Sequence, residues 1–391
     1  MKRLILPLLV FCAASAFGQA LPWAYPGQAV DALDLLPAID TPANGSGFLE
    51  RQIEGISALP PAALSGWVSS YGFAAGLVDK TLFLLPGAAW AGLFRAEEGP
   101  DAFLGFRLAI GRDQILDVDA DNYAVLIASA GFLGYEPLPW LLRGAAVYDL
   151  RRDIYPSVSL ELSAELGSAW DVPLRLYPRL YGDYTSGPTV SSGFGAGLSA
   201  LYLGMAYEGA LPQGVAAAAE LQAGFSPLAG TASWSLSLAT DARLRPLSIL
   251  SGGMTLWARA SSAPYADWAQ YVRGVGDYTK ALAGSAGVAA SAELCLLAAR
   301  GTLLKNEDWD LDALLSGFVD LAYAGDPSRQ ADDPANRLLG AGLQFSLVVP
   351  NLKRNGLRVG AALDLSSLLR GTELAIISED LELFAVVSLQ L

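Results

Sequence analysis

The C-terminal part of this chain alternates apolar and polar residues at every second position, which is the pattern of a β-strand with two different faces. In residues 311–323 the odd positions are apolar or small, whereas the even ones include Asp312, Ser316 and Asp320. The same alternation runs through residues 341–349, 357–365 and 385–391. One face of such a strand can contact lipid while the other lines a wet lumen, so the pattern predicts a transmembrane β-barrel.

The composition favours a membrane protein without membrane helices. Hydrophobic residues make up 53% of the chain and the mean hydropathy is +0.37, yet beyond the N-terminus no run approaches the roughly 20 apolar residues that a membrane helix needs. A closed barrel pairs its backbone groups between strands and leaves no open edge, so it can cross a bilayer. A soluble β-sandwich or β-helix is the alternative, but its outward faces should be more polar than these.

Residues 67–391 allow about 16 strands, at roughly 20 residues for each strand with its connection. Turn-rich segments separate the candidates. Eleven strands are expected before residue 271, centred on Gly72, Ala89, Phe106, Leu126, Ala146, Leu162, Leu176, Ala200, Ala219, Leu236 and Leu256. Five more are expected at 284–298, 311–324, 337–350, 356–369 and 382–391. The predicted fold class is therefore all-β, a transmembrane antiparallel β-barrel.

Residues 1–18 have the features of a secretory signal peptide, with Lys2 and Arg3 ahead of the apolar run 4–14. Cys12 is assigned to this peptide because Phe11 stands where a lipoprotein signal has a small residue. The mature chain then keeps one cysteine, Cys295, which excludes an intramolecular disulfide framework. Export and strand pattern together predict the bacterial outer membrane as the location, with its lipid as a partner.

Residues 19–66 differ from the rest, being rich in proline, alanine and acidic residues. They are interpreted as a short periplasmic leader or plug, with a disordered linker as an equal alternative. The formal net charge is −14 before processing, so nucleic acid is not an expected partner.

A short motif, Tyr271-Val272-Arg273-Gly274-Val275, precedes the last five expected strands, and Phe318-Val319-Asp320 lies on the second of them. This arrangement resembles the BamA/TamA-type superfamily of outer-membrane assembly and two-partner-secretion barrels. The resemblance implies that a Val-Arg-Gly loop enters the lumen, where its arginine meets the aspartate of the Phe-x-Asp motif. Client polypeptides are the partners that such a barrel implies.

The residues themselves support that pairing. Asp320 and Glu293 fall on the polar faces of neighbouring strands, so both carboxylates should point into the lumen. The guanidinium of Arg273 would find a planar, bidentate partner there. The alternative is that Arg-Gly is a common loop dipeptide and Asp320 an ordinary lumen acid.

Three departures from the superfamily pattern bear on whether the chain has the superfamily's assembly activity. Val275 replaces the usual aromatic residue, and Leu391 replaces the usual terminal aromatic residue. Residues 19–66 are also too short for a periplasmic transport-associated domain. Handing over a client would then require a separate periplasmic partner protein, unless the barrel has lost the assembly activity.

Catalysis and cofactors are not expected. The chain contains no histidine, on which outer-membrane phospholipase, protease and acyltransferase barrels depend. The acidic segment 117–121 lacks the glycine and the bidentate glutamate of a calcium loop, so no metal is predicted. Three functions remain: a polypeptide assembly or secretion barrel, a passive porin-like channel, and a structural or surface-exposed outer-membrane protein.

Overall fold

The computed structural model describes residues 66–390 apart from several short stretches. These stretches are 79–80, 95–98, 116–120, 135–139, 150–156, 165, 167–171, 173, 187–189, 209, 266–267, 269–271, 274–281, 283, 303–309, 326–335, 349–355 and 370–380. The predicted signal peptide (1–18), all of the predicted leader (19–66) but its last residue, and the motif residues Gly274 and Val275 lie outside the described residues.

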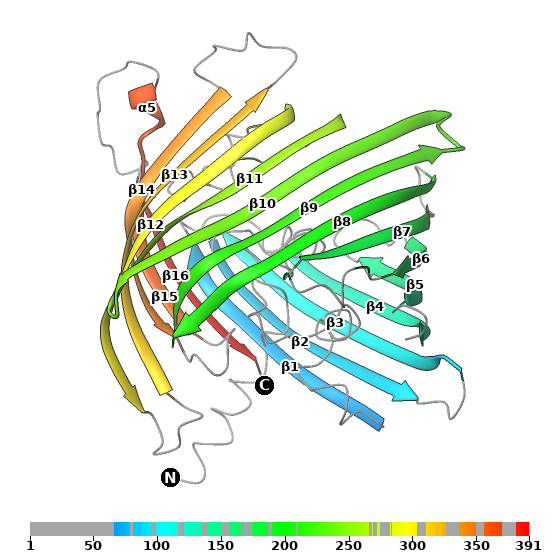
Figure 1. Ribbon diagram of the computed structural model, residues 1–391, viewed down its shortest axis with the longest axis horizontal. Helices are drawn as coiled ribbons and strands as arrows, with labels where there is room; N and C mark the ends of the chain where they lie inside the picture. The colour runs from blue at the N-terminus through cyan, green and yellow to red at the C-terminus, as the bar shows by residue number, and fades with distance from the viewer. Residues whose placement is uncertain are drawn as a thin grey trace.

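Sixteen antiparallel strands and one short helix make up the described fold (Figure 1). The strands are β1 Gly66–Val78, β2 Thr81–Phe94, β3 Asp101–Ile115, β4 Asp121–Gly134, β5 Trp140–Asp149, β6 Ser157–Ala164, β7 Leu174–Thr185, β8 Ser191–Glu208, β9 Leu211–Ser226, β10 Thr231–Leu247, β11 Leu250–Tyr265, β12 Gly284–Thr302, β13 Asp310–Gly325, β14 Arg337–Val348, β15 Gly356–Asp364 and β16 Leu381–Gln390. The helix α5 spans Ser366–Leu369.

Each strand pairs with its neighbours in the sequence, and the sheet closes into a barrel where β1 meets β16. At this seam residues 72–78 pair with residues 390–384. Because every strand is antiparallel to the next, the even-numbered strands all end at one end of the barrel, where β1 begins at Gly66 and β16 ends at Gln390 (Figure 1). We call this the terminus end, and the β11–β12 loop lies at the opposite end. Among the described residues, no helix is long and apolar enough to span a membrane.

The predicted strand pattern is confirmed, including the position of all eleven early strands. Two strand ends differ by more than two residues, and one of them is that of β12, which was expected to end at residue 298 but ends at Thr302. The fifteenth strand was expected to run from 356 to 369, but β15 ends at Asp364 and residues 366–369 form α5. The Asp364 carboxylate accepts a hydrogen bond from the backbone N–H of Ser366, at 2.8 Å, in the manner of a helix N-cap. This local bond competes with the strand ladder and turns the chain after Asp364.

The two faces of the wall differ as the alternation predicts. On β13 the odd-numbered Leu315 and Val319 are 46% and 49% exposed, whereas the even-numbered Asp312 and Asp320 are fully buried. On β10, Trp234, Leu236 and Leu238 are exposed in the same way. The exposed apolar face is therefore the outer surface of the barrel, which contacts lipid in a membrane-embedded protein.

Two adjacent residues of β10 test this assignment. Leu236→Arg places a charge on the outer face and should destabilise the barrel by about 2–4 kcal/mol if it lies near the bilayer midplane. Ser235→Arg adds the same side chain to the lumen face and should be tolerated better. The measurement is the yield of heat-modifiable barrel after refolding into lipid vesicles. Equal losses in both variants would show that the inside and outside have been assigned wrongly.

Candidate functional site

In the loop that joins β11 to β12, residues 266–283, the structure describes Trp268, Val272, Arg273 and Leu282, and these residues pack against the lumen wall. The loop's described apolar residues Trp268, Val272 and Leu282 are at most 3% exposed, although they lie between strands. The backbone N–H of Trp268 donates to the carbonyl of Leu282 at 3.1 Å, which joins the two ends of the loop. Their cluster includes lumen-facing residues of β9 to β14, namely Ala216, Ala239, Trp257, Ala289, Ala322, Ala324 and Leu338. The loop is therefore docked inside the barrel.

Two wall glycines make room for this loop. A Cβ atom on Gly287 of β12 would lie 2.3 Å from the Trp268 ring. A Cβ atom on Gly340 of β14 would lie 1.9 Å from the carbonyl oxygen of Arg273. Both distances are far below van der Waals contact, so the loop approaches the wall at these positions because no side chain is present there.

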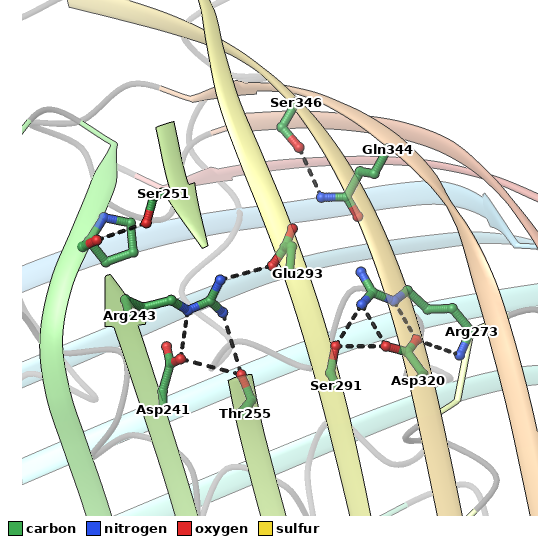
Figure 2. A network of polar contacts seen from close by, with 11 residues as sticks. Asp241, Arg243, Ser251, Thr255, Arg273, Ser291, Glu293, Asp320, Gln344 and Ser346 are labelled. Atoms are coloured by element: carbon green, nitrogen blue, oxygen red, sulfur yellow. Dashed lines mark hydrogen bonds and ion pairs between the residues drawn. The ribbon is translucent and has the colours of Figure 1, made fainter. Parts of the chain in front are cut away.

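The centre of the docked loop is a buried ion pair between Arg273 and Asp320 (Figure 2). Arg273 Nε donates to Asp320 Oδ2 at 2.6 Å and Nη2 donates to Oδ1 at 2.7 Å. The backbone N–H of Arg273 donates to the same Oδ2 at 3.0 Å, and the Ser291 hydroxyl donates to Oδ1 at 2.7 Å. Each carboxylate oxygen thus accepts two hydrogen bonds, which satisfies the buried charge.

Phe318 is two residues before Asp320 on the same face of β13. The Arg273 guanidinium carbon lies 3.3 Å from the centroid of the Phe318 ring, in a cation–π stack. The ring in turn covers Gly342 on β14, its cross-strand neighbour, where a Cβ atom would lie 2.6 Å from the ring. Phe318 therefore fills the space between the arginine and the wall.

Glu293 differs from what the sequence suggested. It was expected beside Asp320 as a lumen partner for the loop arginine, but its ion pair is with Arg243 of β10, at 3.1 Å. Arg243 also contacts Asp241 at 2.6 Å and Thr255 at 3.4 Å (Figure 2). The reason is register: Arg243 pairs with Gly253 and Gly253 pairs with Glu293, so the missing side chain at Gly253 lets Arg243 reach across β11.

The polar residues form a continuous belt across the wall. Asp241, Thr255, Ser291 and Asp320 are successive cross-strand partners from β10 to β13. The row next to them contains Arg243, Glu293 and Phe318. The sequence indicated the motif residues Val272 and Arg273 and the partners Phe318 and Asp320, which the structure brings together. It missed Ser291 as a ligand, Trp268 as an anchor and Arg243, since only register relates them to the loop.

Comparison with known proteins finds similarity at the level of fold. No protein-family model matches the sequence, and no curated protein matches it. Among solved structures, BamA from Haemophilus ducreyi lacking POTRA domains 1–3 is 14% identical, with a TM-score of 0.54, over 83% of this chain and 70% of that chain. CdiB from Acinetobacter baumannii is 12% identical, with a TM-score of 0.49, over 84% of this chain.

The chain spans 60% of the CdiB structure and 70% of the BamA structure. The similarity to BamA shows the fold, that of an outer-membrane β-barrel, and confirms the fold class that the strand alternation predicted. Identity is too low for the comparison to transfer an activity.

Removing either member of the buried pair should release the loop. Arg273→Ala or Asp320→Ala leaves the other charge buried without its partner, which commonly costs about 3–5 kcal/mol. The loop segment 266–283 should become accessible to protease while the barrel remains heat-modifiable. Because the two residues act as a unit, the double variant should be no worse than the worse single variant. Arg175→Ala, which removes an arginine that bonds carbonyls of Val172 and Leu174, serves as the control.

A second pair of variants tests the docking contact without changing a charge. Gly340→Ala places a Cβ atom against the Arg273 carbonyl and should displace the loop. Gly317→Ala, on β13, is the matched control because its nearest neighbour would be the Leu343 side chain at an ordinary 3.6 Å. Protease access to residues 266–283 should rise in the first variant alone. The close approach of loop and wall would be refuted by equal behaviour of the two variants.

Proposed function

We propose that this chain is an integral outer-membrane β-barrel that inserts or passes polypeptides, with its seam between β1 and β16 as the place of opening. The observation that supports this most is the docked β11–β12 loop. Its described apolar residues belong to one buried cluster with residues of β9, β10, β11, β12, β13 and β14, so the loop is fastened to this side of the wall from within.

The register of the seam supports the same proposal. The ladder between β1 and β16 covers only residues 72–78 of β1. The ladder between β12 and β13 is longer and runs from the pair Ala286 and Gly325 to the pair Thr302 and Asp310. The ladder between β1 and β2, at residues 66–71, is shorter than the seam, and that between β6 and β7 is as short, but the strands of each pair are consecutive in the chain. A seam between strands distant in sequence can open without displacing a connecting loop. Fewer ladder hydrogen bonds lower the cost of separation.

The proposal includes outer-membrane lipid as the surroundings, client polypeptides as the substrates and a periplasmic protein that delivers them. It assigns no catalytic step to the chain. Export by a signal peptide at residues 1–18 belongs to the same proposal, because the strand faces require insertion into the outer membrane.

A disulfide lock across the seam tests the opening. Ala75 and Val387 are direct register partners, so Ala75→Cys with Val387→Cys places two thiols at bridging distance. Ala200→Cys with Ala219→Cys gives the same cross-link between β8 and β9. Both pairs are built with Cys295→Ser and reconstituted in lipid vesicles with an unfolded outer-membrane protein as client. The readout is the amount of protease-protected client.

Oxidation of the seam pair should stop client insertion, and reduction should restore it. The β8–β9 pair should behave as the unmodified protein in both states. Equal insertion with the seam locked or open would contradict the proposal.

A passive channel is the second candidate, and the charged side chains that face the lumen favour it. Arg179 pairs with Glu220, and Arg243 pairs with Asp241 and Glu293, so fixed charges of both signs face the interior. Steady ion conductance in planar bilayers that is unaffected by the seam disulfide, together with no client insertion, would support this candidate.

A further inference from the structure

The tip of the β8–β9 hairpin, described at residues 206–208 and 210–213, bends into the lumen at the terminus end. Within the tip β8 and β9 remain paired, from Ala206 with Gln213 to Glu208 with Leu211. The register between β9 and β10 begins at Gly214, which pairs with Arg243. Gly214 has φ +119°, a backbone conformation that side chains with a Cβ rarely adopt. The hairpin tip therefore leaves the wall at a residue suited to a sharp bend.

Beyond this bend the hairpin tip passes β10 and β11 to reach β12 and β13. Leu211 is 1% exposed and packs against Cys295 and Leu314, which face the lumen from β12 and β13. The Ser251 hydroxyl on β11 donates to the carbonyl of Pro212 at 2.9 Å. Contact with strands two, three and four places from β9 in the sheet requires the tip to lie across the inside of the wall.

Asp312 fastens the hairpin tip. Its Oδ2 accepts the backbone N–H of Ala210 at 2.8 Å. Arg300, its cross-strand partner on β12, donates Nε to Oδ1 at 2.7 Å and Nη2 to Oδ2 at 3.0 Å. The carboxylate is fully buried, while the Arg300 side chain is 43% exposed. A buried carboxylate is stabilised by such donors. The bond from the Ala210 N–H therefore holds the hairpin tip to Asp312, whose position on the wall is fixed by Arg300.

The arrangement repeats the one at Asp320. Both aspartates lie on the lumen face of β13, eight positions apart, and are fully buried. Each accepts a bidentate guanidinium and one backbone N–H from a segment that folds inward. At Asp320 that segment supplies both the arginine and the N–H. At Asp312 the arginine belongs to the wall, and the inward segment adds a single N–H.

We propose that the hairpin tip is a lid that narrows the lumen at the terminus end, pivots at Gly214 and is latched by the bond from Ala210 to Asp312. The Arg300–Asp312 pair stays on the wall when the lid leaves, so the carboxylate remains paired in both positions. The lid can therefore open without leaving Asp312 as an unpaired buried charge. Leu211 and the Ser251–Pro212 bond set how firmly it closes. This inference does not depend on whether the barrel handles polypeptides or ions.

Cys295 reports on the lid because Leu211 covers it. In a Cys12→Ser background Cys295 is the sole thiol of the chain. The experiment measures the rate at which a fluorescent maleimide labels the refolded, heat-modifiable barrel, and then its conductance in planar bilayers. Ala210→Pro removes the N–H that Asp312 accepts and leaves Arg300 in place. Ala229→Pro is the matched control, since its N–H makes a 3.4 Å bond within the β9–β10 turn at the opposite end.

Ala210→Pro should raise the labelling rate about tenfold, since a lost bond of this kind shifts an opening equilibrium by roughly that factor, and should raise the conductance. Ala229→Pro should change neither. Faster labelling at unchanged conductance would show that the tip moves without closing the lumen, and would overturn the lid. Unchanged labelling would overturn the latch. Should Ala210→Pro fail to fold, Arg300→Gln and Asp312→Asn replace it, and failure of all three would show a folding requirement in place of a lid.

Discussion

The described structure depends on how the barrel accommodates charge inside its wall. A carboxylate removed from water costs several kcal/mol unless donors replace its hydration. Asp320 meets that requirement with four hydrogen bonds, three of them from Arg273. Because Arg273 lies in a loop, satisfying this charge fixes the loop. The apolar anchors Trp268 and Val272 then pack where the wall offers glycine and alanine.

The same requirement explains why β13 organises the interior. It presents two buried carboxylates to the lumen, and each accepts a backbone N–H from a segment that folds in from a different end of the barrel. If only water faced these two carboxylates, no such bond would hold the two segments to the wall. The wall between them is not uniformly polar, because Leu314, Phe318 and Ala322 also face inward and are buried. The wet lumen expected from the alternation is therefore filled, along this part of the wall, by protein.

Much of the fold could be predicted from the sequence, because strand alternation is local. The even positions of residues 311–323 and the turn signals between strands gave the strand order and the faces without any knowledge of pairing. The end of β15 was missed because a single Asp364 to Ser366 bond decides it. The pairing of Arg273 with Asp320 was indicated by the resemblance of the loop motif and by the face on which Asp320 lies.

The partners that depend on register could not be predicted. Arg243 reaches Glu293 only because Gly253 lies between them in the sheet. In the sequence Glu293 follows Arg243 by fifty positions and Gly253 by forty. The same holds for Ala210 and Asp312, which are 102 residues apart. No spacing within the chain indicates such contacts, since the first arises from strand register and the second from the bend of the hairpin at Gly214.

The central claim is that the β11–β12 loop is docked in the barrel by Asp320. Hydrogen–deuterium exchange at the backbone N–H of Arg273, in the unmodified protein reconstituted in lipid, tests it most directly. A buried amide bonded to a carboxylate at 3.0 Å should exchange as slowly as the amides of β12 and β13. Exchange at the rate of an exposed loop amide would contradict the docked loop.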